Sequence, residues 1–218
     1  MSKLPSPEEL FDLDRSIAGE LIGECGDILI ALSKIDEFIG VLGKGENFCE
    51  VREGVFIGRD VTISSGCEIH PPVIIDDGAE IRQGAYIRGH AIIGKGSVIG
   101  NSTEVKNSSI FDEGKLPHYS YSGDSIIGYR AHLGAGAIIS NLRLDNGEVM
   151  IRLGDKKIPS GRRKLGAFIG DRAEIGSGAV LCPGSIIGRH AMVYPLTRVL
   201  KAIPEGKIFD GEKIRDRR

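Results

Sequence analysis

A branched apolar residue recurs every six residues through the first half of this chain. Ten consecutive positions keep the spacing, and a second series, mostly of small residues, follows each of them by four positions. A period of six fits neither an amphipathic helix nor simple strand alternation, whereas a fixed short repeat is typical of a solenoid whose units stack. The pattern therefore predicts a parallel β-helix with three hexads to each triangular coil. The register consists of Ile57, Ile63, Ile69, Ile75, Ile81, Ile87, Ile93, Ile99, Val105 and Phe111.

The repeat resumes twice, and its interruptions divide the chain into segments. Residues 51–200 are predicted to form the β-helix, because hexads return at Ile127, Leu133 and Ile139, and again from Ile169 to Val193. A polar stretch over residues 145–168 is expected to be an inserted loop. Residues 1–50 are expected to form a helical hairpin and linker that covers the open end of the solenoid or packs on its side; binding a partner is an alternative role. Residues 201–218 are expected to be a C-terminal extension that has lost the repeat.

Composition narrows the function classes. The formal net charge is −2 and no basic stripe is visible, so nucleic acid is not an expected partner. No apolar run approaches the roughly 20 residues of a membrane-spanning helix, and the first residues lack a signal-peptide pattern. A soluble, cytoplasmic protein is therefore expected. The cysteines show no CxxC spacing, which favours buried free thiols over a metal or disulfide role; they are Cys25, Cys49, Cys67 and Cys182.

Basic residues break the repeat at two stacked positions. Arg88 and Lys106 are 18 residues apart, about one coil, so they are expected to lie on one face at the strand spacing of roughly 4.8 Å. Two stacked cations repel each other unless an anion lies between them, although a solvated surface pair is the alternative on spacing alone. His118 lies in Pro117–Asp124, where the register slips, and an imidazole can accept a proton from an amine near neutral pH.

Several segments resemble the acetyltransferase half of bifunctional UDP-N-acetylglucosamine pyrophosphorylase/glucosamine-1-phosphate acetyltransferases. These segments are Asn101–Lys106, Pro117–Asp124, Leu133–Gly136 and Asn141. Asn141–Arg143 and Ser160–Ala167 are more similar to the archaeal-type sugar-1-phosphate nucleotidylyltransferase/acetyltransferases.

The resemblance covers roughly residues 55–200. It implies a left-handed β-helix, a homotrimer, and acetyl-CoA-dependent N-acetylation of glucosamine-1-phosphate or galactosamine-1-phosphate that feeds nucleotide-sugar synthesis. The nucleotidyltransferase domain of that family is not recognisable in this chain, so uridylyltransfer is not expected.

The resemblance also implies a role for individual residues. His118 matches the general base, and Asn141 matches a residue that orients the substrate. Arg88 and Lys106 match the cations that hold the sugar phosphate. Further substrate-binding positions are Glu104, Tyr121 and His132, and the positions near the acyl carrier are Ala135 and Ser177.

Departures from the family pattern leave an alternative open. Gly147 stands where the family has a lysine, Met150 also lacks a charge, and Pro195 replaces an alanine of the CoA groove. These departures favour a non-catalytic sugar-phosphate-binding or scaffolding protein, unless a nearby cation substitutes; the candidates are Arg143, Arg152 and Lys156. A zinc carbonic anhydrase of the same fold needs three histidines on adjacent coils. The five histidines do not form such a set, so no metal is expected.

Overall fold

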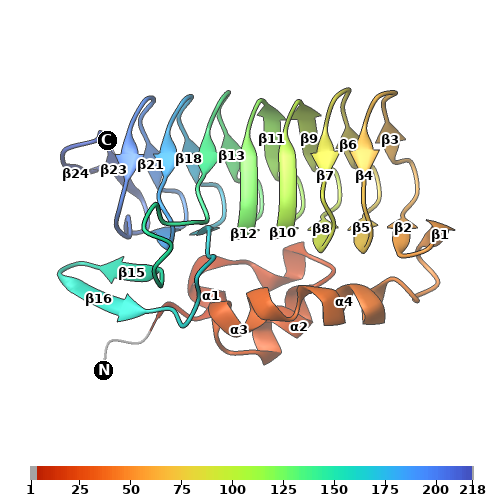
Figure 1. Ribbon diagram of the computed structural model, residues 1–218, viewed down its shortest axis with the longest axis horizontal. Helices are drawn as coiled ribbons and strands as arrows, with labels where there is room; N and C mark the ends of the chain where they lie inside the picture. The colour runs from red at the N-terminus through yellow and green to blue at the C-terminus, as the bar shows by residue number, and fades with distance from the viewer. Residues whose placement is uncertain (1–3, 218) are drawn as a thin grey trace.

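A computed structural model describes residues 4–217, and its strands wind into a three-sided rod (Figure 1). The predicted parallel β-helix is confirmed. We name the faces A, B and C in the order in which the chain visits them. Face A contains β2 (Val55–Ile57), β5 (Val73–Ile75), β8 (Ala91–Ile93), the C-terminal parts of β10 (Glu104–Ile110) and β12 (Tyr121–Ile127), β17 (Ala167–Ile169) and β20 (Ser185–Ile187).

Each remaining face repeats the same parallel pairing. Face B contains β3 (Thr62–Ile63), β6 (Glu80–Ile81), β9 (Val98–Asn101), β11 (Lys115–His118), β13 (His132–Leu133), β18 (Glu174–Ile175), β21 (Met192–Val193) and β23 (Lys207–Phe209). Face C contains β4 (Glu68–Ile69), β7 (Tyr86–Ile87), the N-terminal parts of β10 and β12, β14 (Ile138–Ile139), β19 (Val180–Leu181) and β22 (Arg198–Val199).

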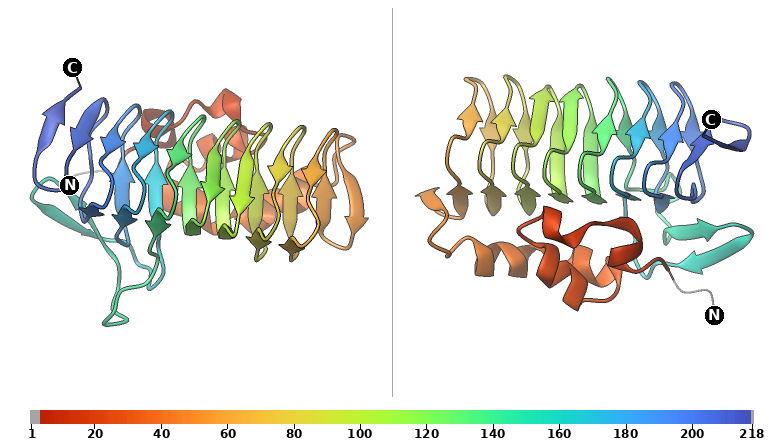
Figure 2. Two further views of the ribbon diagram at one scale, coloured as in Figure 1. Left: turned by 90° about the horizontal axis from the view of Figure 1, so that it is seen from above. Right: turned by 180° about the vertical axis from the view of Figure 1, so that it is seen from behind.

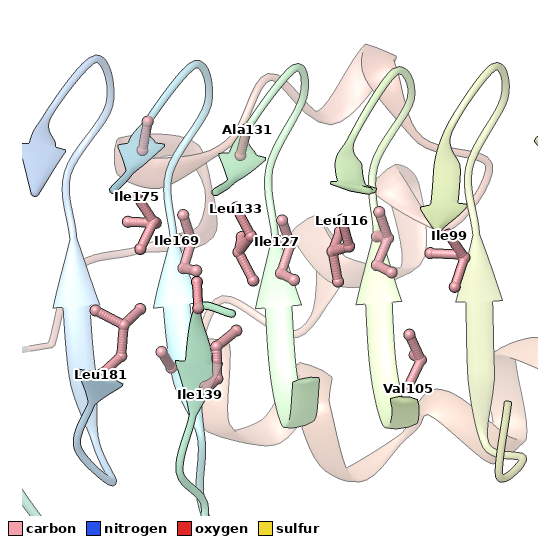
Figure 3. Packing of buried hydrophobic residues seen from close by; sticks show 14 of the residues in the cluster. Ile99, Val105, Leu116, Ile127, Ala131, Leu133, Ile139, Ile169, Ile175 and Leu181 are labelled. Atoms are coloured by element: carbon pink, nitrogen blue, oxygen red, sulfur yellow. The ribbon is translucent and has the colours of Figure 1, made fainter. Parts of the chain in front are cut away.

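The inward side chains stack in continuous columns along the rod. Ile99, Leu116 and Leu133 come from successive coils of face B and are fully buried (Figure 3). Small residues such as Ala131 fill the positions between the branched ones. The core is therefore built by neighbouring coils only, as the hexad pattern predicts.

Two coils in the middle of the rod are each one residue shorter than the regular coil of 18 residues. Val105 aligns with Ser122 and Ile110 with Ile127, so five residues, not six, separate the inward positions at these turns. A single left-handed residue makes each short turn: Asn107 has φ 44° and Asp124 has φ 52°. The register slip inferred from the sequence is therefore two separate one-residue deletions at the corner between faces C and A.

The shortened coil corrects one position of the predicted register. Ile110, not Phe111, points into the core at this level. Phe111 lies outside the rod, where its ring packs against Phe11 with the centroids 5.1 Å apart. The sequence did not reveal the shift because Ile110 and Phe111 are both large apolar residues, so either one fits the inward position of the repeat.

The N-terminal segment packs along face A, on the side of the rod, and does not cover its end (Figures 1 and 2). Where the sequence predicted two helices, the chain forms four short ones: α1 (Pro7–Leu10), α2 (Gly19–Glu24), α3 (Ile28–Ser33) and α4 (Ile35–Leu42), with a 3₁₀ turn at Leu13–Arg15. Asp27 caps α3 by accepting a hydrogen bond from the Leu29 amide at 2.7 Å. Among residues 4–217, none of the helices is long and apolar enough to cross a membrane.

Antiparallel strands close both ends of the ladder. β1 (Cys49–Arg52) pairs with β2, and β24 (Ile214–Asp216) pairs with β23. The solenoid thus runs past residue 200 to Phe209. The inserted loop contains a hairpin of β15 (Met150–Leu153) and β16 (Lys156–Pro159), which approaches β20 on face A. β1 and β24 thus pair with strand edges that would otherwise offer unpaired backbone groups.

Candidate functional site

Arg88 and Lys106 lie on adjacent coils, where the chain passes from face C to face A; we call this edge the C/A corner. The Arg88 amide donates to the Val105 carbonyl at 2.8 Å, so the two cations occupy stacked positions, as predicted. Each has its own carboxylate. Arg88 Nη1 lies 2.7 Å from Glu104 Oε1, and Lys106 Nζ lies 3.7 Å from Asp124 Oδ1.

Asp124 is the centre of this cluster, although sequence reasoning did not single it out. Its side chain is buried and accepts hydrogen bonds from the amides of Asn107, at 2.7 Å, and of Asn141. The three residues stand at the same corner position of successive 17-residue coils. A buried carboxylate that accepts two amide donors holds those side chains in fixed orientations. The sequence signal that could have identified this cluster is the 17-residue spacing of Asn107, Asp124 and Asn141.

Tyr121 crosses face C toward the same corner. Its hydroxyl lies over Gly123, where a Cβ atom would come within 2.4 Å of the hydroxyl oxygen. Burial raises the pKa of Tyr121, and the negative charges of Glu104 and Asp124 raise it further. The phenol therefore stays protonated at neutral pH and can donate a hydrogen bond. Gly123 is required here because any side chain would displace the ring.

His118 lies at the opposite edge of face C, the B/C corner, and its side chain is exposed. Its carbonyl accepts from the Gly136 amide, and the Ala135 carbonyl accepts from the Gly178 amide in the same way. His118, Ala135 and Ser177 therefore stack on successive coils, all exposed. Because Ala135 and Ser177 are small, they leave the surface below the imidazole open along the rod.

The two corners are separate sites of polar groups within one chain. The extended chain from Ser120 to Gly123 spans face C between them, and its three steps of about 3.3 Å cover roughly 10 Å. The structure thus brings together Arg88, Glu104, Lys106, Tyr121 and Asn141 at the C/A corner, with no direct contact to His118.

His132 belongs to neither group. It lies on β13 of face B, and its Nδ1 is 2.9 Å from Glu174 Oε2. It lines a hollow on that face together with Lys115. A site on face C would include His132 only if a second chain supplied it.

None of the cations named as substitutes for the missing lysine contacts the C/A corner. Arg143 pairs with Asp145 in the loop that projects from the rod between β14 and β15 (Figure 2). Arg152 and Lys156 lie on the β15–β16 hairpin.

Arg162, which sequence reasoning missed, is the cation that the inserted loop brings near Asp124. Its Nη2 donates to the Leu29 carbonyl at 2.5 Å, and burial lowers its pKa despite the favourable charge of Asp124. Among residues 4–217, no group of three or more His, Cys, Asp and Glu side chains is arranged to hold a metal ion.

Two family models match parts of the chain. The bacterial transferase hexapeptide model, of six repeats, matches residues 48–89, and the GMPPB C-terminal domain model matches residues 69–154. A bifunctional sugar-1-phosphate nucleotidylyltransferase/acetyltransferase of Sulfurisphaera tokodaii is 44% identical over 102 residues, which are 47% of this chain and 25% of the relative. A bifunctional protein GlmU of Methanococcus maripaludis is 43% identical over 86 residues, covering 39% of this chain and 21% of the relative.

The matched part thus spans about a quarter or less of the length of these two relatives. A perosamine N-acetyltransferase mutant from Caulobacter crescentus, solved with CoA and GDP-perosamine, aligns with a TM-score of 0.44 and 20% identity over 71% of this chain and 55% of its own. The acetyltransferase domain of PglB from Neisseria gonorrhoeae, solved with acetyl coenzyme A, aligns with a TM-score of 0.37 and 16% identity over 97% of this chain and 73% of its own. From its repeat and the matches over residues 48–154, the chain contains a left-handed β-helix domain of hexapeptide repeats that is similar to the corresponding part of these acetyltransferases.

Proposed function

We propose that this protein transfers an acetyl group from acetyl-CoA to the amine of an amino-sugar 1-phosphate, glucosamine-1-phosphate or galactosamine-1-phosphate. The observation that supports it most is the layout of face C. A pair of stacked cations, Arg88 and Lys106, lies at one edge and an exposed imidazole, His118, at the other. The names of the relatives, sugar-1-phosphate nucleotidylyltransferase/acetyltransferase and GlmU, agree with this chemistry.

Each edge of face C has a role in the proposed reaction. Arg88 and Lys106 hold the phosphate, because guanidinium and ammonium groups form strong charge-assisted hydrogen bonds with it. Their carboxylate partners, Glu104 and Asp124, hold the two cationic side chains in place before the phosphate binds. With the phosphate held there, the sugar lies over Tyr121 and its amine points toward His118.

His118 acts as the general base in this proposal. Its imidazole takes a proton from the sugar amine while the nitrogen forms a bond to the thioester carbonyl carbon. The tetrahedral intermediate then collapses, the carbon–sulfur bond breaks, and the CoA thiolate leaves and is protonated. The open column at Ala135 and Ser177 gives the acyl donor a place beside the imidazole. Asn141 orients the substrate from the other edge.

Thiol release tests this proposal directly. The full chain, incubated with acetyl-CoA and glucosamine-1-phosphate or galactosamine-1-phosphate, is expected to release free CoA thiol. His118→Ala should lower the rate by roughly a hundredfold or more, since general bases contribute about 10²–10⁴. Thiol release that persists in His118→Ala would refute the role of the imidazole.

The phosphate assignment has its own test. Arg88→Ala is expected to raise KM for the sugar phosphate roughly ten- to hundredfold, with a much smaller effect on KM for acetyl-CoA. Arg59→Ala is the matched control, because Arg59 also pairs with a carboxylate, Asp77 at 2.6 Å, but away from face C. Equal changes for both substrates in Arg88→Ala would refute the assignment.

A second function is favoured by Gly147 and Met150, which supply no charge where the family has a lysine. In this alternative the protein binds the sugar phosphate, as a scaffolding or regulatory protein, without turnover. Saturable binding of glucosamine-1-phosphate, with no release of CoA thiol from acetyl-CoA in the presence of any amino-sugar phosphate, would favour it over the transferase.

We also propose that the protein is a homotrimer. The N-terminal helices cover face A only and leave faces B and C free for neighbours (Figure 2). Face C of one copy beside face B of the next would bring His132 to the sugar site. Sedimentation equilibrium is expected to give three times the mass of the 23.4 kDa chain, and a monomer would refute this assembly.

A further inference from the structure

A positively charged hollow of about 710 Å³ lies on face B, where that face meets the A/B corner. Its permanent cations are Lys115, Arg130, Arg172 and Arg217, and its carboxylates are Glu113 and Glu174. Four cations against two carboxylates leave the hollow with a net positive charge before any histidine is protonated. The size is within the range of small-molecule pockets.

Part of this charge is arranged as a ladder. Arg130, Arg172 and His190 occupy the same corner position on successive coils: the Arg172 amide donates to the Tyr129 carbonyl at 2.7 Å, and the His190 amide to the Asp171 carbonyl at 2.8 Å. Neighbouring strands are roughly 4.8 Å apart. Basic side chains at that spacing repel one another unless an anion lies between them.

The backbone of the ladder is costly for these residue types. Arg130, Arg172 and His190 have φ of 54°, 55° and 56°, in the left-handed region that favours glycine. The same column holds Gly96 and Glu113 before them, with φ of 62° and 56°, and Gly206 after them, with φ of 66°. Glycine would therefore be the easier residue at each of these positions.

The two carboxylates of the hollow are already engaged. Glu113 accepts from Arg130 Nε at 2.8 Å and from the Tyr129 hydroxyl at 3.1 Å, and Glu174 contacts His132. Arg172 instead lies over the Tyr129 ring, 5.4 Å from its centroid. Within residues 4–217, neither Arg172 nor Lys115 forms an ion pair, although the charge of Lys115 contributes to lowering the pKa of Glu113 in the same hollow.

We infer that this hollow is a second anion site, which binds a diphosphate group, either free or as part of a nucleotide. The excess of two positive charges balances a compact anion of two or more negative charges better than a monoanion. Guanidinium groups from two coils and the ammonium of Lys115 offer donors from several directions, which suits the oxygens of two linked phosphates. Within one copy the site lies on face B and the A/B corner, away from Arg88 and Lys106, and in the proposed trimer it would adjoin face C of the next copy through His132.

Titration of the full chain with inorganic pyrophosphate at low salt tests this site. Calorimetry is expected to show saturable binding that weakens as salt is added, because exposed charges are screened. The double variant Arg172→Gly/His190→Gly removes two rungs of the ladder while supplying the residue that the left-handed backbone favours. It should fold as well as the original chain and bind pyrophosphate at least tenfold more weakly.

Two control variants test whether the loss of binding is specific to the hollow on face B. Asp60→Gly makes the same kind of change at a left-handed corner residue (φ 54°) outside the hollow, and should leave binding unchanged. Arg59→Ala, which removes an arginine outside both the hollow and face C, should also leave it unchanged. Absence of saturable binding, equal binding by the double variant, or loss of binding in Arg59→Ala would overturn the inference.

Uridine and adenosine diphosphates distinguish the sources of the ligand. Affinity equal to that of pyrophosphate would mean that the phosphates alone are recognised. Tighter binding of one nucleotide, lost in the Arg172→Gly/His190→Gly variant, would mean that the hollow also contacts the base or the ribose. Both results support a diphosphate site on face B.

Discussion

The carboxylate of Asp124 accepts a hydrogen bond from the side-chain amide of Asn141, 17 residues further along the chain. The same carboxylate accepts from Asn107 and lies 3.7 Å from Lys106 Nζ. One buried acid therefore holds a cation and two amides at the C/A corner. Their positions depend on each other, because a change at Asp124 leaves several groups without a partner.

Asp124→Asn is expected to destabilise the fold by about 1–3 kcal/mol, because an amide nitrogen would replace one acceptor oxygen and face another donor. Asparagine tolerates the left-handed backbone at this position, so strain does not explain the loss. Urea unfolding measures the change. Asp145→Asn, at an exposed carboxylate paired with Arg143, is the control and should shift stability by less than about 0.5 kcal/mol. Similar effects of both substitutions would contradict the importance of the buried contacts.

Leu133→Ala tests the stacked core. Leu133 is fully buried between Leu116 and Ile175, so its truncation leaves a cavity that neighbouring coils cannot close, at a cost of about 2–5 kcal/mol. Leu144→Ala makes the same chemical change at a fully exposed side chain in the projecting loop, and should cost almost nothing. Chemical denaturation of the pair gives the comparison. Near-equal midpoints would mean that the core packs loosely.

Two glycines make a second matched pair. A Cβ at Gly100 would lie 1.6 Å from the Pro117 carbonyl oxygen on the next coil, so Gly100→Ala must push the coils apart and should prevent or severely weaken folding. Gly40 lies within α4 with nothing within 4 Å of its Cβ position, so Gly40→Ala should stabilise the protein by up to about 1 kcal/mol through helix propensity. Circular dichroism melting curves measure both. A stable Gly100→Ala variant would contradict the tight spacing of the coils.

The raised pKa of Asp112 leads us to expect a pH-dependent contribution to the stability of the fold. Burial raises the pKa of Asp112 to about 6, whereas the unfolded chain has an ordinary carboxyl pKa of about 3.9. Between those values the folded state binds a proton that the unfolded state does not, so this group favours folding increasingly as pH falls through 6. Asp112→Asn keeps the acceptor for the Lys95 amide and removes the buried charge. It should raise stability at pH 8, with an advantage that narrows toward pH 5.

Urea unfolding of both proteins at pH 8, 7, 6 and 5 checks this prediction. Other titrating groups contribute equally to the two proteins and cancel in the difference. A difference that stays constant across the range would contradict a raised pKa at Asp112.

The hexad pattern was sufficient to predict the parallel β-helix, because every six-residue unit places a branched apolar residue at the position that points into the core. It failed where two adjacent residues are both apolar: Ile110 and Phe111 fit the pattern equally, and only the packing against Phe11 distinguishes them. The N-terminal helices were predicted as two longer elements. The break at Gly26 was predicted, but the spacing of apolar residues continues across the breaks at Phe11 and Lys34, so periodicity alone does not mark where each helix ends.

The candidate site was predictable to the extent that it depends on coil spacing. Arg88 and Lys106 stack because 18 residues make one regular coil. Asp124 was missed because its contacts follow the shortened coil of 17 residues, which the sequence reveals only once the one-residue deletions are located. His118 was expected near the cations, whereas roughly 10 Å of extended strand across face C separates its corner from theirs.

The strand pairing between Ile127 and Ile169 joins residues 42 positions apart, with Ile126 beside Phe168 as on any uninterrupted coil. β13 and β14 complete that coil, and the inserted loop between β14 and β17 leaves the rod and returns to it without disturbing the register. Variants of this chain that exchange the loop should therefore keep the same stack of coils. Because the loop buries Val149 and Ile151 in the cluster outside the rod, such an exchange would change stability through that cluster and not through the register of the coils.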